Sequence, residues 1–278
     1  MIKNKIRSDA RGVATLVIAI VVVIIIAGAG VTAYVVISNN NNNSSDNSGG
    51  GTGGGSGGGS DNPSPSLGGP GFNAGESLTY TLSGGMTGNV DGTAINMDNA
   101  LSGTITFSSK QESNGDYTVT VAIDILCSML GVDYPVSTTE KITVSSLDMS
   151  EMSTNTADLS SLSGQGYTDQ DLQNIQTLLN KYTSETVTLS TVDGNLTVEK
   201  RTYSYNWDDF KSLVPDVSSS LGSIPIDTLN LSMLLWFGKD VLYKTTFTLS
   251  MSGDFDGDGT PDSFAYTGSL VLTDHQTA

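Results

Sequence analysis

Residues 254–262, DFDGDGTPD, place carboxylate side chains at alternating positions of one short stretch. Asp254, Asp256 and Asp258 take the first, third and fifth places, and a glycine at the sixth permits a sharp turn. Calcium takes about six to eight oxygen ligands, and alternate carboxylates in such a loop can converge on one centre. The sequence therefore predicts a structural Ca²⁺ ion held by Asp254, Asp256, Asp258, Thr260 and Asp262.

The same loop resembles the calcium loops of FG-GAP repeats, through GDFDGDGTPDSF at residues 253–264. An EF-hand requires a glutamate at the twelfth place and flanking helices, but that place holds Ala265 and the flanks have strand composition. The resemblance covers one short stretch and occurs once, so it implies the loop and not the propeller fold. Without the bidentate glutamate we expect weak affinity, with a Kd of about 10⁻⁴–10⁻³ M.

The chain has a single cysteine, Cys127, and a single histidine, His275. One cysteine cannot form an internal disulfide, and its apolar surroundings predict a small core residue. His275 lies near the chain end, where we expect fraying and exposure. Nucleophilic catalysis through Ser-His-Asp or Cys-His groups therefore has no positioned base. The sequence predicts no enzyme, with no catalytic and no cofactor-binding residue.

The N-terminal residues combine a basic stretch with a long apolar one. Residues 1–12 contain four Lys and Arg residues against one Asp, and residues 13–37 contain no charge. At 1.5 Å per residue, this apolar stretch exceeds the ~30 Å hydrocarbon core of a bilayer. We therefore expect a basic cytoplasmic tail (1–12), a single-pass transmembrane helix (13–37) and an extracellular remainder at the cell membrane.

The N-terminus also resembles the class III signal peptides of archaeal pilins, through RSDARGVATLVIAIVVVIII at residues 7–26. That resemblance implies cleavage between Gly12 and Val13 and packing of the apolar helix into a filament core. The chain departs from the pilin layout because a long linker follows the helix. A retained anchor and a pilin-like subunit both stay open.

The linker, residues 38–71, is rich in Asn, Ser and Gly, which cannot bury enough apolar surface to fold. We expect a disordered tether. Asn42 and Asn43 lie in glycosylation sequons, as do Asn195 and Asn230 farther on, and all four would be accessible to glycosylation outside the cell. The net charge of −17 disfavours nucleic acid as a partner, because an acidic domain repels phosphates.

Residues 72–278 form the expected extracellular β-rich domain. Runs rich in Thr, Val, Ile and Tyr alternate with Gly, Asn and Asp turn signals, and residues 192–195 indicate a hairpin turn. Residues 168–182 have a capping pattern and an apolar stripe typical of a helix, and residues 226–238 suggest a second. We predict a mainly β fold: an antiparallel curved sheet or partial barrel packed on a helix, with a two-sheet sandwich as the alternative.

Residues 79–93 and 246–260 align without gaps, which suggests that one hairpin unit occurs twice. These features predict a membrane-anchored cell-surface protein with a calcium-stabilised ectodomain and a structural, adhesive or partner-binding role. One alternative is the pilin-like filament subunit. Another is an extracytoplasmic carrier of lipid or peptide, with LSMLLWF at residues 231–237 as its binding region.

Overall fold

The structure, a computed structural model, describes residues 66–90, 92–129, 132–144, 146–149, 177, 180–209, 226–254 and 258–278. The predicted tail, the predicted membrane helix and most of the linker lie outside these residues. Within them, no helix has both the length and the apolar character that crossing a bilayer requires.

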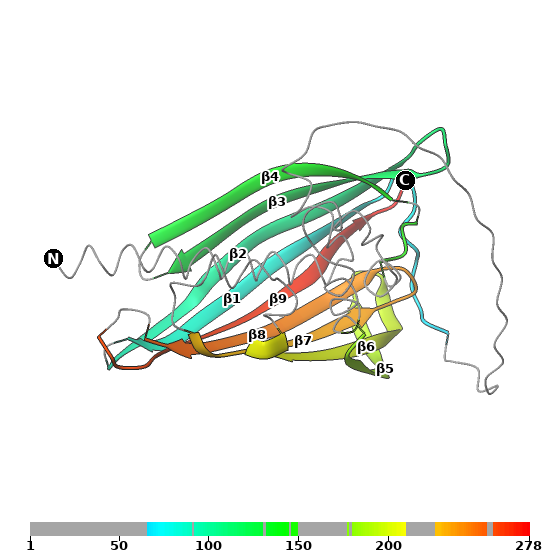
Figure 1. Cartoon of the computed structure of the whole chain (residues 1–278). Coiled ribbons are helices and arrows are strands. Elements are labelled where there is room, and N and C mark those ends of the chain that lie inside the picture. Colours follow the sequence, from blue (N-terminus) through cyan, green and yellow to red (C-terminus); the bar gives the residue numbers. More distant parts are fainter. Residues whose placement is uncertain are drawn as a thin grey trace.

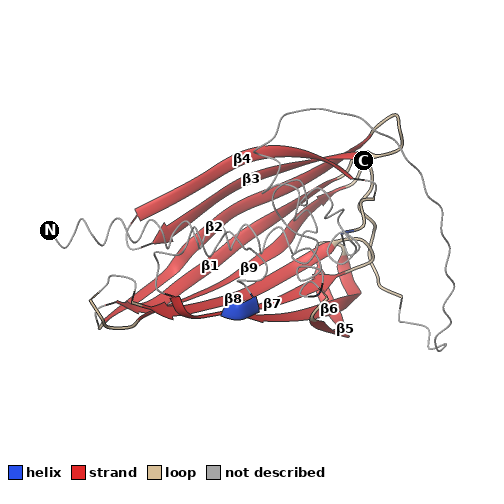
Figure 2. Cartoon of the chain, in the orientation of Figure 1, coloured by secondary structure: helices blue, strands red, loops and turns tan. Residues whose placement is uncertain are grey.

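The described residues form one nine-stranded antiparallel sheet, with very little helix (Figures 1 and 2). Its strands are β1 (Ser77–Val90), β2 (Thr93–Gln111), β3 (Tyr117–Met129), β4 (Val132–Val144), β5 (Tyr182–Thr191), β6 (Gly194–Asn206), β7 (Ile226–Phe237), β8 (Leu242–Gly253) and β9 (Asp262–Gln276). The prediction of a mainly β, antiparallel fold is confirmed. The alternative of a two-sheet sandwich is wrong, because all nine strands share one sheet.

The strand order is β4-β3-β2-β1-β9-β8-β7-β6-β5. The chain thus runs outward from β1 to β4, begins again at the opposite edge with β5, and returns to the middle (Figure 1). The last strand, β9, pairs with the first, β1, on one side and with β8 on the other. This central position lets β9 connect the two halves of the sheet.

Apolar side chains alternate along the strands and are buried on one face, which we call the inner face. In β8, for example, Phe247, Leu249 and Met251 are buried, while Thr248 between them is exposed. Alternation of this kind follows from the two-residue period of a strand. The inner face therefore holds the hydrophobic core.

The prediction of a helix over residues 226–238 is wrong, because residues 226–237 form β7. The buried side chains of β7 occur at every second position: Leu229, Leu231, Met233, Leu235 and Phe237. Pairing with β6 and β8 on either side favours this extended arrangement over the helix propensity of leucine. Of the other predicted helix, 168–182, most residues lie outside those described, and Tyr182 begins β5. A helix against the sheet stays a prediction.

The opposite, outer face carries small hydroxylated side chains that bond across strands. Four such pairs are Thr79–Thr106 (3.3 Å), Thr81–Thr273 (3.1 Å), Ser83–Ser269 (3.2 Å) and Thr228–Ser252 (2.7 Å). Cross-strand hydroxyl pairs each stabilise a sheet by roughly 0.2–1 kcal/mol. The outer face is thus polar without relying on charge at these positions.

The sheet is strongly twisted and curved (Figure 1). Two features of the central strands accompany the curvature: the β1–β2 register shifts between Gly84 and Met86, and Gly103 in β2 has a φ of +141°. A Cβ atom at Gly103 would collide with the backbone of Asp124 on β3, so only glycine fits there. Register shifts and glycines within strands are features that commonly allow a sheet to bend.

The suggested repeat maps onto two hairpins at the centre of the sheet. Residues 79–93 cover β1 and its turn into β2, and residues 246–260 cover β8 and its loop into β9. Strands β1 and β8 run in the same direction on the two sides of β9, because each is antiparallel to it. Both hairpin tips therefore lie at one end of the sheet, and Asn89 near the first tip pairs with Ser263 beside the second.

Candidate functional sites at the two ends of strand β9

The acidic loop precedes β9 and forms a turn closed by its own carboxylates. The backbone N–H of Gly259 donates to Oδ2 of Asp254 at 3.0 Å, and the N–H of Thr260 donates to Oδ1 of Asp258 at 2.7 Å. Gly259 has a φ of +86°, which suits the sharp turn expected at the sixth place. The first and sixth places of the loop are thus in contact.

The predicted calcium ligands differ in their surroundings. Asp258 and Thr260 are exposed, Asp254 is half-buried, and Asp262 is buried at the start of β9. Asp256 lies outside the described residues. Among the residues that the structure describes, no three His, Cys, Asp or Glu side chains are grouped as a metal site. The closed turn fits a calcium loop in part, and Ca²⁺ binding stays a prediction.

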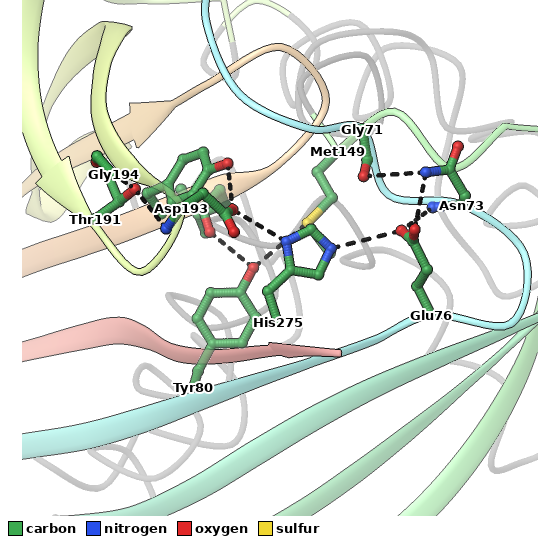
Figure 3. A network of polar contacts seen from close by, with 11 residues as sticks. Gly71, Asn73, Glu76, Tyr80, Met149, Thr191, Asp193, Gly194 and His275 are labelled. Carbon is green, nitrogen blue, oxygen red and sulfur yellow. Dashed lines mark hydrogen bonds and ion pairs between the residues drawn. The ribbon is translucent and has the colours of Figure 1, made fainter. Parts of the chain in front are cut away.

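At the other end of β9, His275 lies between two carboxylates (Figure 3). Its Nδ1 is 3.0 Å from Oδ2 of Asp193, and its Nε2 is 3.5 Å from Oε2 of Glu76. The second distance is long for a hydrogen bond, so we treat that contact as an ion pair. Only 1% of the His275 side chain is exposed, which makes the expectation of a frayed, exposed histidine wrong.

The pairing of β9 with β1 explains why His275 is buried. The β1–β9 register shifts between Thr79 and Tyr80, so that Tyr80 pairs with Leu272 and Leu78 pairs with His275. Leu78, Tyr80 and Leu272 are all buried on the inner face. The shift therefore places His275 on the same face, although its distance from Leu272 in the sequence is an odd number of residues.

Asp193 comes from the tight turn between β5 and β6, which confirms the predicted hairpin at residues 192–195. The N–H of Asp193 donates to the hydroxyl of Thr191 at 3.1 Å, and that hydroxyl donates to the carbonyl of Gly194 at 2.9 Å. The Tyr243 hydroxyl donates to Oδ2 of Asp193 at 2.8 Å. Burial, with this contact to Asp193, raises the pKa of Tyr243, so the hydroxyl stays a donor.

Glu76 comes from the residues just before β1 and is fixed by Asn73. The Asn73 backbone N–H donates to Oε2 of Glu76 at 2.6 Å, and its side-chain amide donates to Oε1 at 3.0 Å. Burial alone would raise the pKa of Glu76, but these hydrogen bonds and His275 outweigh it and lower that pKa. Glu76 is thus held as a carboxylate facing His275.

Residues 66–72 pack beside this network. The N–H of Gly68 donates to the carbonyl of Thr197 at 2.8 Å, the N–H of Lys239 donates to the carbonyl of Gly68 at 3.1 Å, and Phe72 is buried. The end of the predicted linker range therefore lies against β6 and the β7–β8 loop. We call residues 66–76 the leading segment.

The geometry of this network suits a structural contact between segments better than it suits catalysis. A general base needs a nitrogen within hydrogen-bond reach of a substrate proton. Both nitrogens of His275 instead face protein carboxylates, and the ring is enclosed. The network joins the leading segment, the β5–β6 turn and the end of β9.

Sequence reasoning also missed a second buried charge. Arg201 on β6 is 6% exposed, its Nη2 is 2.8 Å from Oε2 of Glu199, and its guanidinium carbon is 4.6 Å from the centre of the Phe237 ring. Nothing in the local pattern distinguishes this arginine from Lys200 beside it, because its inward position depends on pairing with Leu235.

The remaining predicted positions fall as follows. Cys127 is buried in β3, as expected, and burial raises the pKa of its thiol to about 11. Asn195 is exposed beside the β5–β6 turn, and Asn230 is exposed on the outer face of β7. Asn42 and Asn43 lie outside the described residues.

Comparisons with known proteins do not identify a relative of this chain. No protein-family model and no curated protein matches it. One solved structure found by similarity is the dehydratase domain of RzxB from Pseudomonas fluorescens, at 12% identity over 71% of this chain and 77% of that one. Its TM-score is 0.12, and a likeness this slight supports no inference about function.

Proposed function

We propose that the chain is a membrane-anchored cell-surface protein whose acidic β-rich ectodomain has a structural, adhesive or partner-binding role. The observation that carries the proposal is the order of segments: a basic stretch (1–12), 25 uncharged residues (13–37), a Gly/Ser/Asn linker (38–71) and then one sheet. A basic flank favours the cytoplasmic side, which leaves the sheet outside the membrane.

The outer face of the sheet supports a partner-binding role. In β1, β9 and β8 it presents hydroxyls in neighbouring strands, which lie about 4.8 Å apart. Short hydroxylated side chains lose little conformational entropy on binding and can both donate and accept hydrogen bonds. Such a surface suits a broad, uncharged partner lying flat on the sheet.

Protease treatment of intact cells tests this placement. We expect the full-length chain in the membrane fraction, and a protease that cuts within residues 38–71 should release the sheet domain from the cell surface. A chain recovered in the soluble fraction, or one protected until cells are broken, would contradict the proposal.

The pilin-like alternative is supported by Gly12 placed directly before the apolar stretch. Mass spectrometry of the mature N-terminus separates the two functions. A mature chain that starts at Val13 favours the filament subunit, and a chain that retains residues 1–12 favours the plain anchor.

The carrier alternative is supported by two hydroxyls on the inner face. Within the described part of the chain, the hydroxyls of Tyr266 and Thr245 are buried and have no hydrogen-bond partner. A buried unpaired hydroxyl costs roughly 1–3 kcal/mol, which a bound ligand could recover. Native mass spectrometry of the purified full-length chain should show a co-purified lipid or peptide if this alternative is right, and a bare chain mass if it is wrong.

A further inference from the structure

We propose that His275 is a pH-sensitive latch: its protonated ring ties the leading segment and the β5–β6 turn to the end of β9, and loss of the proton releases them. This latch goes beyond the proposed surface role and does not depend on membrane anchoring.

The first argument is the position of the three charged groups in the fold. Glu76 precedes β1, which neighbours β9, but Asp193 lies between β5 and β6. Strands β8 and β7 separate β9 from β6 in the sheet, so the His275–Asp193 contact joins parts that the sheet's own hydrogen bonds do not join. Figure 3 shows the ring placed between the two carboxylates. Loss of the His275 charge therefore weakens its contacts with the β5–β6 turn and with the leading segment together.

The second argument is the hydrogen-bonding capacity of imidazole. A protonated ring directs an N–H toward each carboxylate, with a hydrogen bond to Asp193 and an ion pair with Glu76, whereas a neutral ring has one donor and one acceptor. A neutral His275 would thus face one of the two carboxylates with a lone pair. The side chains of Glu76 and Asp193 are only 8% and 18% exposed, so water compensates little for the lost partner.

The sign of the pH dependence follows from this geometry. The latch is closed while His275 carries its proton, and it opens as the pH rises and the ring becomes neutral. At a pH low enough to protonate Glu76, the ion pair between Glu76 and His275 is lost and the latch opens as well.

Other ionisable side chains lie around the network. Burial raises the pKa values of Tyr80 and Tyr243, so both hydroxyls stay neutral, and Tyr80 donates to the carbonyl of Leu242 at 2.7 Å. Asp240 in the β7–β8 loop lies close to Gly71, and burial and the nearby Asp148 raise its pKa. The remaining charged neighbours are Lys239, whose backbone holds Gly68, and Asp274, which is exposed and accepts from Gln276. In this part of the described structure, His275 is the ionisable side chain that faces both Glu76 and Asp193.

The consequence concerns the residues where the chain enters the sheet. The leading segment is held by the Gly68 bonds, by Phe72 and by the Glu76–Asn73 contacts. Opening the latch removes the positive charge that faces Glu76 and so weakens one of the contacts that hold this segment.

The test uses the full-length chain in detergent micelles, labelled with ¹⁵N-histidine. Because His275 is the chain's single histidine, its ring gives one assignable titration curve by NMR. Hydrogen exchange of peptides covering 66–76 and 190–197 is followed from pH 5.5 to 8.5, after correction for the intrinsic pH dependence of exchange. We expect protection in both peptides to fall at least tenfold as the pH rises, with the same midpoint as the ring titration.

Two variants sharpen the test. His275→Gln should show the low protection at every pH, and the matched control Asp274→Asn, at the exposed neighbouring position, should keep the wild-type curve. If His275→Gln fails to fold, the wild-type comparison of the two midpoints still decides. Protection that does not change with pH, or that changes with a midpoint unrelated to the ring, overturns the latch.

Discussion

The two ends of β9 hold carboxylates in opposite ways. At the acidic loop, aspartates at alternate positions of one short stretch lie in a single turn, where Asp254 and Asp258 accept hydrogen bonds from the loop's own backbone N–H groups. At the His275 end, one aspartate and one glutamate from distant segments are enclosed around a single ring. The first arrangement is local and visible in the sequence, and the second is assembled only by the fold.

This difference indicates where each end contributes to stability. A local, exposed cluster repels itself unless a cation binds, so its contribution depends on the solution. A buried pair that crosses the sheet is screened little by salt, and removing one member leaves a charge without its partner. We therefore expect the His275 end to dominate stability and the loop end to respond to added ions.

The largest expected effect comes from breaking the buried end. Glu76→Ala should lower the free energy of unfolding by about 3 kcal/mol, because the buried His275 ring loses one of its two charged partners. Thermal and urea unfolding measure the change. The matched control is Glu185→Ala, whose side chain is 60% exposed and pairs with Lys200, and it should cost less than about 1 kcal/mol. Equal losses in the two variants would remove the distinction between the two kinds of carboxylate.

The next effect concerns the loop end. Calcium at about ten times its Kd should stabilise the chain by about 1.4 kcal/mol, which calorimetry detects as a rise in Tm reversed by chelator. The double variant Asp256→Ala, Asp258→Ala should lose this response, while Asp193→Asn should be destabilised yet keep it. No shift of the wild-type Tm at 10 mM Ca²⁺ would refute the predicted site.

A smaller effect is expected from the donor to Asp193. Tyr243→Phe removes the 2.8 Å hydrogen bond but keeps the ring, and should cost about 1 kcal/mol in unfolding free energy. Tyr117→Phe, at a half-buried position on β3, is the matched control and should change stability by less than half of that. If Tyr117→Phe costs more unfolding free energy than Tyr243→Phe, the hydrogen bond from Tyr243 to Asp193 does not stabilise the fold.

The smallest expected effect is the loss of stability at acid pH. The pKa of Glu76 is lowered in the folded chain from its ordinary 4.5. Its contribution to the free energy of unfolding is therefore complete above about pH 4.5 and is lost as the pH falls through the lowered pKa. Urea unfolding between pH 6 and 3 should show stability decreasing with acid, and Glu76→Gln should flatten the curve. A wild-type curve that rises toward pH 3 would contradict the lowered pKa.

Local patterns predicted much of the sheet, since alternation and turn residues mark hairpins such as the one around Asp193. They failed at residues 226–238, where closely spaced leucines satisfy a helix as well as a strand until β6 and β8 pair on both sides. They also failed at His275, because its burial requires a one-residue register shift and its Asp193 partner lies 82 residues away. Such features depend on which strands become neighbours, and no short stretch of sequence contains that information.

The central position of β9 has a consequence for how the domain forms in a cell. Without β9, no ladder of hydrogen bonds joins the first half of the sheet (β1–β4) to the second half (β5–β8), since β4 and β5 are the two edges. If the chain is exported from its N-terminus, both halves leave the exporting channel before the strand that unites them. They must then wait as separate, partly apolar sheets, which are prone to pairing with other chains. Export through to residue 276 would thus be the step that commits the molecule to its native assembly and ends its exposure to aggregation.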